Sequence, residues 1–330
     1  MKRTAFTRRE WLVASSAAAA SLVVAAWPRR PYDAGSFLLP AESPVVALAA
    51  EHYEVDVAEL ILRGLRELKV DVAGKQVLLK PNLVEFEPGT VINTDPRVVV
   101  GAAVALRRAG ARRVIVAEGP GHRRDLEYLA ASTGLLERLR GERVELVDLN
   151  HDDVYERRLR SWFTGLPGLA LPQALLEADL VVSMPKLKTH HVAGITCSMK
   201  NLFGVVPGAV YGWPKNLLHY RGITESILDL NATVRPGLTI VDGIVGMEGD
   251  GPIMGVAKPT GVLLMGTDLA AVDATAARIM GLRPERIAYL AEAGKFLGNT
   301  AAERIVMRGE PWQRFATPFD VLPQFESLRV

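Results

Sequence analysis

Two kinds of hydrophobic pattern follow one another in turn along most of this chain. Short apolar runs bounded by Gly, Pro or charged residues are typical of buried strands, and longer stretches with helical spacing separate them. We expect strands near 45–49, 76–80, 113–117, 144–148, 180–184, 238–241 and 261–265. Alternating strands and helices predict an α/β fold with a mostly parallel sheet covered by helices.

Two of the predicted helices have clear boundaries. One begins at the Thr-Asp-Pro segment 94–96, where an acceptor side chain is followed by a proline suited to the first turn, and it ends near Gly110. The other runs from about Asp268 to Met280. We expect Asp268 to cap this second helix and Asp273 to lie inside it.

The first 26 residues have the features of an export signal. A twin-arginine segment, Thr7-Arg8-Arg9-Glu10-Trp11-Leu12, precedes an Ala-rich apolar run that reaches Ala26. The run is short for a transmembrane helix, although an uncleaved leader would anchor the chain to a membrane. We predict a Tat signal over 1–26, a linker over 27–44 and a single α/β domain over 45–330.

This signal implies the Tat export machinery as a partner and a periplasmic or other extracytoplasmic location, with membrane contact only through the leader. Residues 1–30 carry a net charge of +5, so the whole chain's +2 leaves −3 for residues 31–330. A mildly acidic mature chain does not favour a nucleic acid partner. Cys197 is the only cysteine, so no disulfide or iron–sulfur cluster can form within this chain, and we expect it to be a small buried residue.

The segment from Met184 to Gly208 carries the densest group of titratable side chains. It leaves a predicted strand at Pro185, and in an extended chain Lys186, Lys188 and His190 point to the same side. Crowded lysines lower one another's pKa toward the range where an amine acts as a base or nucleophile. A small anionic ligand is the functional interpretation, and solvated surface lysines are the structural alternative.

Polar residues also follow other predicted strands. In parallel α/β sheets ligands bind beyond the carboxyl ends of the strands, so we expect these strand exits to form one site. The predicted catalytic residues are Lys186, Lys188, His190 and Lys200, and the predicted substrate-binding residues are Lys80, Asn82, Glu118, Asn201, Asp242 and Glu248.

A metal is a second possibility for this site. His190 is the predicted metal ligand, and His122, His219, Glu118 or Asp242 could complete the set, although no pair has a recognised zinc spacing. Residues 242–252 place three acids among four glycines, which predicts either a mobile lid or an acidic surface turn.

Several motifs together resemble the domain of unknown function 362 family. They are Lys80-Pro81-Asn82-Leu83, Pro185-Lys186-Leu187-Lys188-Thr189-His190, Lys200-Asn201-Leu202-Phe203-Gly204, the segment from Asp242 to Pro252, and the segment from Asp268 to Ala274. This resemblance covers nearly all of the predicted mature chain and implies the fold. Some members of the family carry a ferredoxin-like iron–sulfur segment, whose cysteines this chain lacks.

A second, local resemblance concerns residues 190–200, which are similar to a segment of nickel-pincer lactate racemases. It implies His190 as a metal ligand and Lys200 as the covalent attachment point of the cofactor. Cys197-Ser198 replaces the small glycine pair of that motif. Two functions stay open: an exported enzyme that binds a small anionic substrate or cofactor, and a non-catalytic metal or redox-cofactor maturation protein for another exported enzyme.

Overall fold

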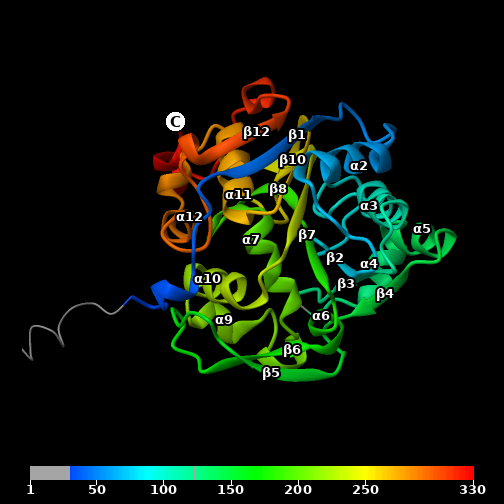
Figure 1. The fold of residues 1–330 in the computed structure, drawn as a ribbon, viewed down its shortest axis with the longest axis horizontal. Coiled ribbons are helices and arrows are strands. Elements are labelled where there is room, and N and C mark those ends of the chain that lie inside the picture. The colour runs from blue at the N-terminus through cyan, green and yellow to red at the C-terminus, as the bar shows by residue number, and fades with distance from the viewer. Residues whose placement is uncertain (1–29, 122) are drawn as a thin grey trace, which may run out of the picture.

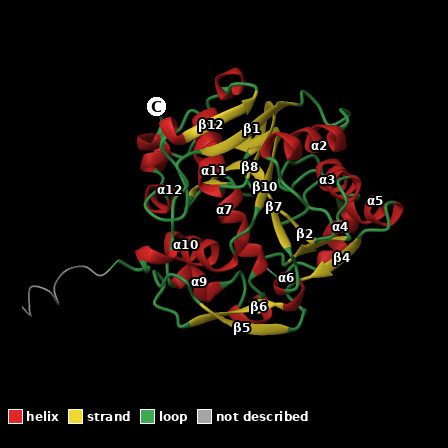
Figure 2. Cartoon of the chain, viewed as in Figure 1, coloured by secondary structure: helices red, strands yellow, loops and turns green. Residues whose placement is uncertain are grey.

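The computed structural model describes residues 30–121 and 123–330, so the predicted export signal lies outside the described residues. A 10-stranded sheet forms the centre of the molecule (Figures 1 and 2). Its main strands lie in the order β12 (Ile305–Gly309), β1 (Ser43–Ala49), β11 (Val256–Gly266), β10 (Leu238–Glu248), β7 (Leu180–Met184), β2 (Gln76–Pro81), β3 (Arg113–Glu118) and β4 (Glu145–Asp148). Two further strands, β8 (Lys186–His190) and β9 (Gly194–Thr196), continue from β10.

Most pairs of neighbouring strands are parallel. The run from β10 through β7, β2 and β3 to β4 is parallel throughout, whereas the hairpin of β10 and β11 is antiparallel and β11 also pairs antiparallel with β1. Each of the seven predicted strands is present, which confirms the predicted α/β class with its mostly parallel sheet. The separate hairpin of β5 (Val154–Arg158) and β6 (Gly168–Pro172) was not predicted, because β5 is exposed along its whole length and has no buried apolar face.

Helices cover both faces of the sheet (Figure 1). Alternate residues of β1 belong to the two cores, since Val46 packs with one group of helices and Val45 with the other. The first group is α2 (Val57–Leu68), α3 (Pro96–Arg108), α4 (Leu126–Ser132) and α5 (Leu135–Gly141). The second is α6 (Gln173–Leu176), α7 (Ser198–Asn201), α9 (Asn216–Tyr220), α10 (Ile223–Val234), α11 (Leu269–Ile279) and α12 (Ala288–Ala293), while α8 (Gly208–Tyr211) is a short turn near α9.

Both predicted helix starts are confirmed by their capping hydrogen bonds. The Asp95 carboxylate accepts from the Arg97 amide at the start of α3, and the Asp268 carboxylate accepts from the Ala271 amide at the start of α11. Asp273 lies inside α11, as expected, and Cys197 is fully buried.

The segment that precedes β1 differs from the predicted linker. Tyr32 and Phe37 are buried, and the Tyr32 ring stacks on Phe296 with centroids 4.1 Å apart. The Trp162 amide donates to the Pro31 carbonyl, 2.8 Å away. Aromatic packing therefore fixes this segment to the domain. Among the helices of the described residues, none combines the length and apolar character that a bilayer crossing requires.

The predicted loop over residues 242–252 is largely a strand. β10 continues to Glu248 and pairs with β11, with a register shift between Gly243 and Val245, so this part is neither a lid nor a surface turn. Its glycines permit close approach of β8: a Cβ atom at Gly246 would lie 2.9 Å from the Leu187 carbonyl oxygen. The glycines that suggested a flexible loop instead allow two strands to pack tightly.

Candidate functional site

A pocket of about 370 Å³ lies where β2, β3 and β8 end, beside α7. This is the carboxyl end of the parallel strands, where the sequence predicts a shared site. Seven predicted residues line it: Lys80, Asn82, Glu118, Lys188, His190, Lys200 and Asn201.

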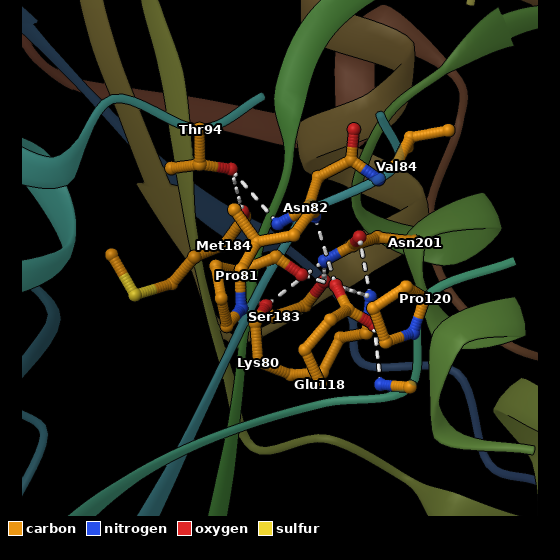
Figure 3. A network of polar contacts seen from close by, with 12 residues as sticks. Lys80, Pro81, Asn82, Val84, Thr94, Glu118, Pro120, Ser183, Met184 and Asn201 are labelled. Carbon is orange, nitrogen blue, oxygen red and sulfur yellow. Dashed lines mark hydrogen bonds and ion pairs between the residues drawn. The ribbon is translucent and has the colours of Figure 1, made fainter. Parts of the chain in front are cut away.

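The floor of the pocket is a buried ion pair, drawn in Figure 3. Lys80 Nζ lies 2.8 Å from Glu118 Oε2 and also donates to Asn201 Oδ1 and the Pro81 carbonyl. Burial lowers the pKa of Lys80, and the Glu118 charge opposes that shift. With three acceptors around its ammonium group, Lys80 stabilises the site and has no donor left for a ligand.

Hydrogen bonds from neighbouring elements hold α7 at the pocket wall. The Asn201 side-chain amide donates to the Lys80 carbonyl and to Ser183 Oγ, which joins α7 to β2 and β7 (Figure 3). At the other end of the helix, the Asp273 carboxylate accepts from the Ser198 and Met199 amides. Burial raises the pKa of Asp273 to about 6. This positioning role of Asp273 was not predicted, because its partner is distant in sequence.

Lys200 projects from α7 into the pocket without a polar partner. Within residues 30–121 and 123–330, its Nζ atom has no hydrogen bond or ion pair, and it lies 4.1 Å from the centroid of the Phe203 ring. Burial, and then the charge of Lys80, lower the pKa of Lys200 to about 8. Lys200 is therefore an amine that can exchange a proton near neutral pH.

Lys188 is fully buried on the opposite wall. Its Nζ donates to the Ile92 carbonyl at 2.7 Å and to the Pro252 carbonyl at 3.2 Å. Burial, followed by the charges of Lys186, Lys200 and Lys80, lowers its pKa well below the ordinary lysine value. A bound anion would oppose this repulsion and raise the pKa again.

His190 is held as a neutral hydrogen-bond donor. Its Nδ1 accepts from the Val192 amide at 3.0 Å and the Ala193 amide at 3.2 Å, so the ring proton is on Nε2. Burial, followed by the charge of Lys200, lowers its pKa to about 2. The imidazole therefore stays uncharged at any physiological pH.

This hydrogen-bond pattern does not fit the predicted metal ligand. A histidine that binds a metal through Nε2 needs a free lone pair there and usually donates from Nδ1, which is the reverse of His190. Among the described residues, no group of three His, Cys, Asp or Glu side chains is arranged to hold a metal ion. His122 lies outside those residues. The nickel-pincer arrangement therefore lacks a fitting ligand at His190.

Two buried oxygens that line the pocket have no hydrogen-bond partner within the described part of the chain. They are Asn82 Oδ1 and Thr196 Oγ1, whose residues are 8% and 4% exposed. Unpaired buried polar atoms are destabilising, so these two oxygens are available for hydrogen bonds with water or with a ligand in the pocket. Thr196 was not predicted, because its strand, β9, is short and has no distinctive pattern.

Three predicted residues do not line this pocket. Lys186 Nζ pairs with Asp242 Oδ2 at 2.6 Å and donates to the Tyr53 hydroxyl. The two residues are opposite one another in the register of β8 and β10, so the pair joins these strands. Glu248 pairs with Lys258 on the adjacent strand at 2.9 Å. These three side chains are occupied by structural contacts.

A lysine that the sequence did not single out also lines the pocket. Lys215 Nζ donates to Asn150 Oδ1 at 2.7 Å and to the Val206 carbonyl. Burial, followed by the opposing charge of Glu118, leaves its pKa lowered to about 8. It precedes α9 rather than following a strand, so the strand-exit argument could not find it.

The fold and this site define an α/β protein with a cationic pocket at the carboxyl ends of its strands. Residues 77–278 match the family model described as a domain of unknown function (DUF362), a range that contains every residue lining the pocket. The chain belongs to the DUF362 family, as its sequence motifs predict.

One curated relative is a thylakoid-associated protein from Synechocystis sp. (strain ATCC 27184 / PCC 6803 / Kazusa). It is 31% identical over 237 residues, which cover 70% of this chain and 71% of the relative. Among solved structures, the lactate racemase apoprotein from Thermoanaerobacterium thermosaccharolyticum aligns with a TM-score of 0.46 and 14% identity over 74% of this chain and 59% of that one.

A protein from Thermotoga maritima aligns with a TM-score of 0.40 and 12% identity, over 67% of this chain and 57% of that one. This chain therefore spans less than two thirds of either solved structure. At these scores and identities, neither alignment carries an argument about activity.

Proposed function

We propose that the pocket binds a small carboxylate-bearing substrate and that Lys200 transfers a proton to or from it. The observation that carries the proposal is the Lys200 amine, which projects into the pocket with no polar partner among the described residues. In this proposal the Nε2–H group of His190 donates to a carbonyl or carboxylate oxygen of the substrate.

The charges around the pocket support an anionic ligand. Glu118 is the one carboxylate in the lining, and Lys80 pairs with it. Lys188, Lys200 and Lys215 then remain without a carboxylate partner, and a bound anion would favour the positively charged form of each. A volume of about 370 Å³ is at the small end of the range for ligand sites, which favours a compact molecule.

The protonation states support proton transfer. With a pKa of about 8, roughly a tenth of Lys200 is a neutral amine at pH 7, whereas an ordinary lysine has well under a thousandth in that form. A neutral imidazole N–H is a suitable electrophile, since it polarises a carbonyl without adding a full charge. Lys200 would take a carbon-bound proton adjacent to the polarised group and return one from its ammonium form.

A location outside the cytoplasm or at a membrane is the second part of the proposal. The predicted Tat signal supports it, and so does the name of the cyanobacterial relative, which is thylakoid-associated. The protein would then bind its substrate outside the cytoplasm.

Hydrogen–deuterium exchange into the substrate tests the chemistry. The full-length protein is incubated in D₂O with a panel of short-chain mono- and dicarboxylates, and carbon-bound deuterium is followed by NMR. We expect exchange that is abolished in Lys200→Met, retained in the surface control Lys295→Met, and abolished in Lys200→Arg although Arg keeps the positive charge.

Two results would contradict the proposal. Exchange that persists in Lys200→Met would remove Lys200 as the base. Binding of a carboxylate to the wild-type protein without any exchange would favour the alternative, a non-catalytic binding protein.

A further inference from the structure

Four arginines surround a second hollow, at the opposite end of the sheet from the pocket. This hollow has a volume of about 430 Å³ and an apolar floor that includes Leu175 and Val181. It opens at the amino ends of β7 and β10, whereas the pocket lies at the carboxyl ends of the strands. The four arginines are Arg157, Arg158, Arg160 and Arg235, and we name them the arginine face.

The arginine face carries unneutralised charge. All four residues are exposed, and within residues 30–121 and 123–330 none of their guanidinium groups has an ion pair or a hydrogen bond. The one carboxylate that lines the hollow, Asp179, already pairs with Arg112 at 3.6 Å. The guanidinium groups of the arginine face can therefore pair with an anion from outside the chain, and a guanidinium fork matches the geometry of a phosphate.

The first described residues lie beside the arginine face. The guanidinium carbons of Arg160 and Arg235 lie 5.9 and 5.8 Å from the centroid of the Phe37 ring. Nearby, the Pro31 carbonyl accepts from the Trp162 amide. Residue 30, where the description begins, is therefore at this surface, and the sequence immediately before it contains the apolar run that ends at Ala26.

Large exposed apolar side chains accompany the arginines. Trp162 is 47% exposed and lies two residues after Arg160, and Leu38 is 89% exposed and follows Phe37. Trp at the edge of an arginine cluster is typical of surfaces that lie in the headgroup region of a bilayer.

We infer that the arginine face, with Trp162 and Leu38, docks on an anionic lipid bilayer. The guanidinium groups bind lipid phosphates, and the two apolar side chains enter the interface. In this orientation the pocket, at the other end of the sheet, stays open to solvent. This contact is additional to the one predicted through the leader.

Vesicle co-sedimentation of the full-length protein tests this inference. The probe is phosphatidylcholine vesicles with or without phosphatidylglycerol. The test variant is Arg157→Gln/Arg158→Gln/Arg160→Gln, and the matched control is Arg63→Gln/Arg108→Gln/Arg138→Gln, which removes the same charge from exposed arginines of α2, α3 and α5. All proteins keep the leader, so differences between them report on the folded surface.

We expect the wild-type protein and the control to prefer the phosphatidylglycerol vesicles. The test variant should show a preference at least about tenfold smaller, because three arginines that attract the anionic surface have been removed. Circular dichroism checks that each variant is folded. Equal binding of the wild type to both vesicles, or an equal loss in the control, would overturn the inference. Retained preference in the folded test variant would do the same.

Discussion

Lysines of this molecule differ from one another in pKa and in hydrogen bonding, and their hydrogen-bond partners account for the difference. Lys80 donates to three acceptors and has a structural role. Lys200 has no acceptor among the described residues, and its pKa is about 8. His190 is a donor because two backbone amides occupy its Nδ1. The chemistry of the pocket is thus decided by partners that no local sequence pattern specifies.

The protonation state of His190 is a direct prediction at this scale. Because its pKa is about 2 and Nδ1 is an acceptor, its ring should remain the neutral Nε2–H form from about pH 5 to about pH 8. Imidazole ¹⁵N chemical shifts of the wild-type protein, assigned with His190→Gln, measure this. An Nδ1–H form, or protonation with a midpoint near the ordinary value of about 6.5, would contradict the hydrogen bonds described here.

The sequence predicted the residues of the site better than their roles. Seven of the predicted side chains line the pocket. Lys80, Asn82 and Glu118 do so because they lie at the ends of the neighbouring parallel strands β2 and β3, and the ends of such strands meet in space. Lys186 and Asp242 looked equivalent to them but pair with each other. Only the register of β8 on β10 brings that pair together, and this register depends on contacts distant in sequence.

Among the elements, α7 and the 3-10 turn that follows it, η2 (Leu202–Val205), determine the shape of the pocket wall. The sequence could not predict these short elements. For β8 it indicated an extended segment, but the alternating Lys-Leu-Lys-Thr-His pattern is typical of an exposed strand, whereas every residue of β8 is buried. Because lysines are seldom buried, a strand that contains two of them is expected to be exposed, and this expectation is wrong for β8. The regular strands and capped helices were predictable because their signals are local.

Gly204 in η2 is the position at which this packing is most sensitive. A Cβ atom there would overlap the Glu118 carboxylate and the Lys80 ammonium group, which have no space to move in the buried ion pair. We expect Gly204→Ala to lower the free energy of unfolding by about 2–4 kcal/mol.

The control is Gly141→Ala in α5, where a Cβ atom would meet nothing within 4 Å, so stability should be unchanged or slightly higher. Urea unfolding followed by circular dichroism compares the two. Equal effects of the two substitutions would show that the ion pair does not constrain this wall.

At the scale of the whole molecule, the two ends of the sheet have different surfaces. The carboxyl ends of the strands carry the pocket, and its lining lies within the DUF362 match. The opposite end carries the arginine face, next to the point at which the chain enters the described structure. In this arrangement the proposed substrate reaches the pocket while the other end of the molecule contacts a membrane.

Isothermal titration of the short-chain carboxylate panel into the full-length protein tests the central claim, that this pocket is an anion site built around Lys200. We predict saturable binding to the wild-type protein and to Lys295→Met, and binding at least about tenfold weaker in Lys200→Met. Affinity should fall between about pH 6.5 and about pH 9.5, because Lys200, with its pKa of about 8, loses its charge in that interval. Binding that Lys200→Met leaves unchanged, or no binding of any carboxylate, would contradict the account.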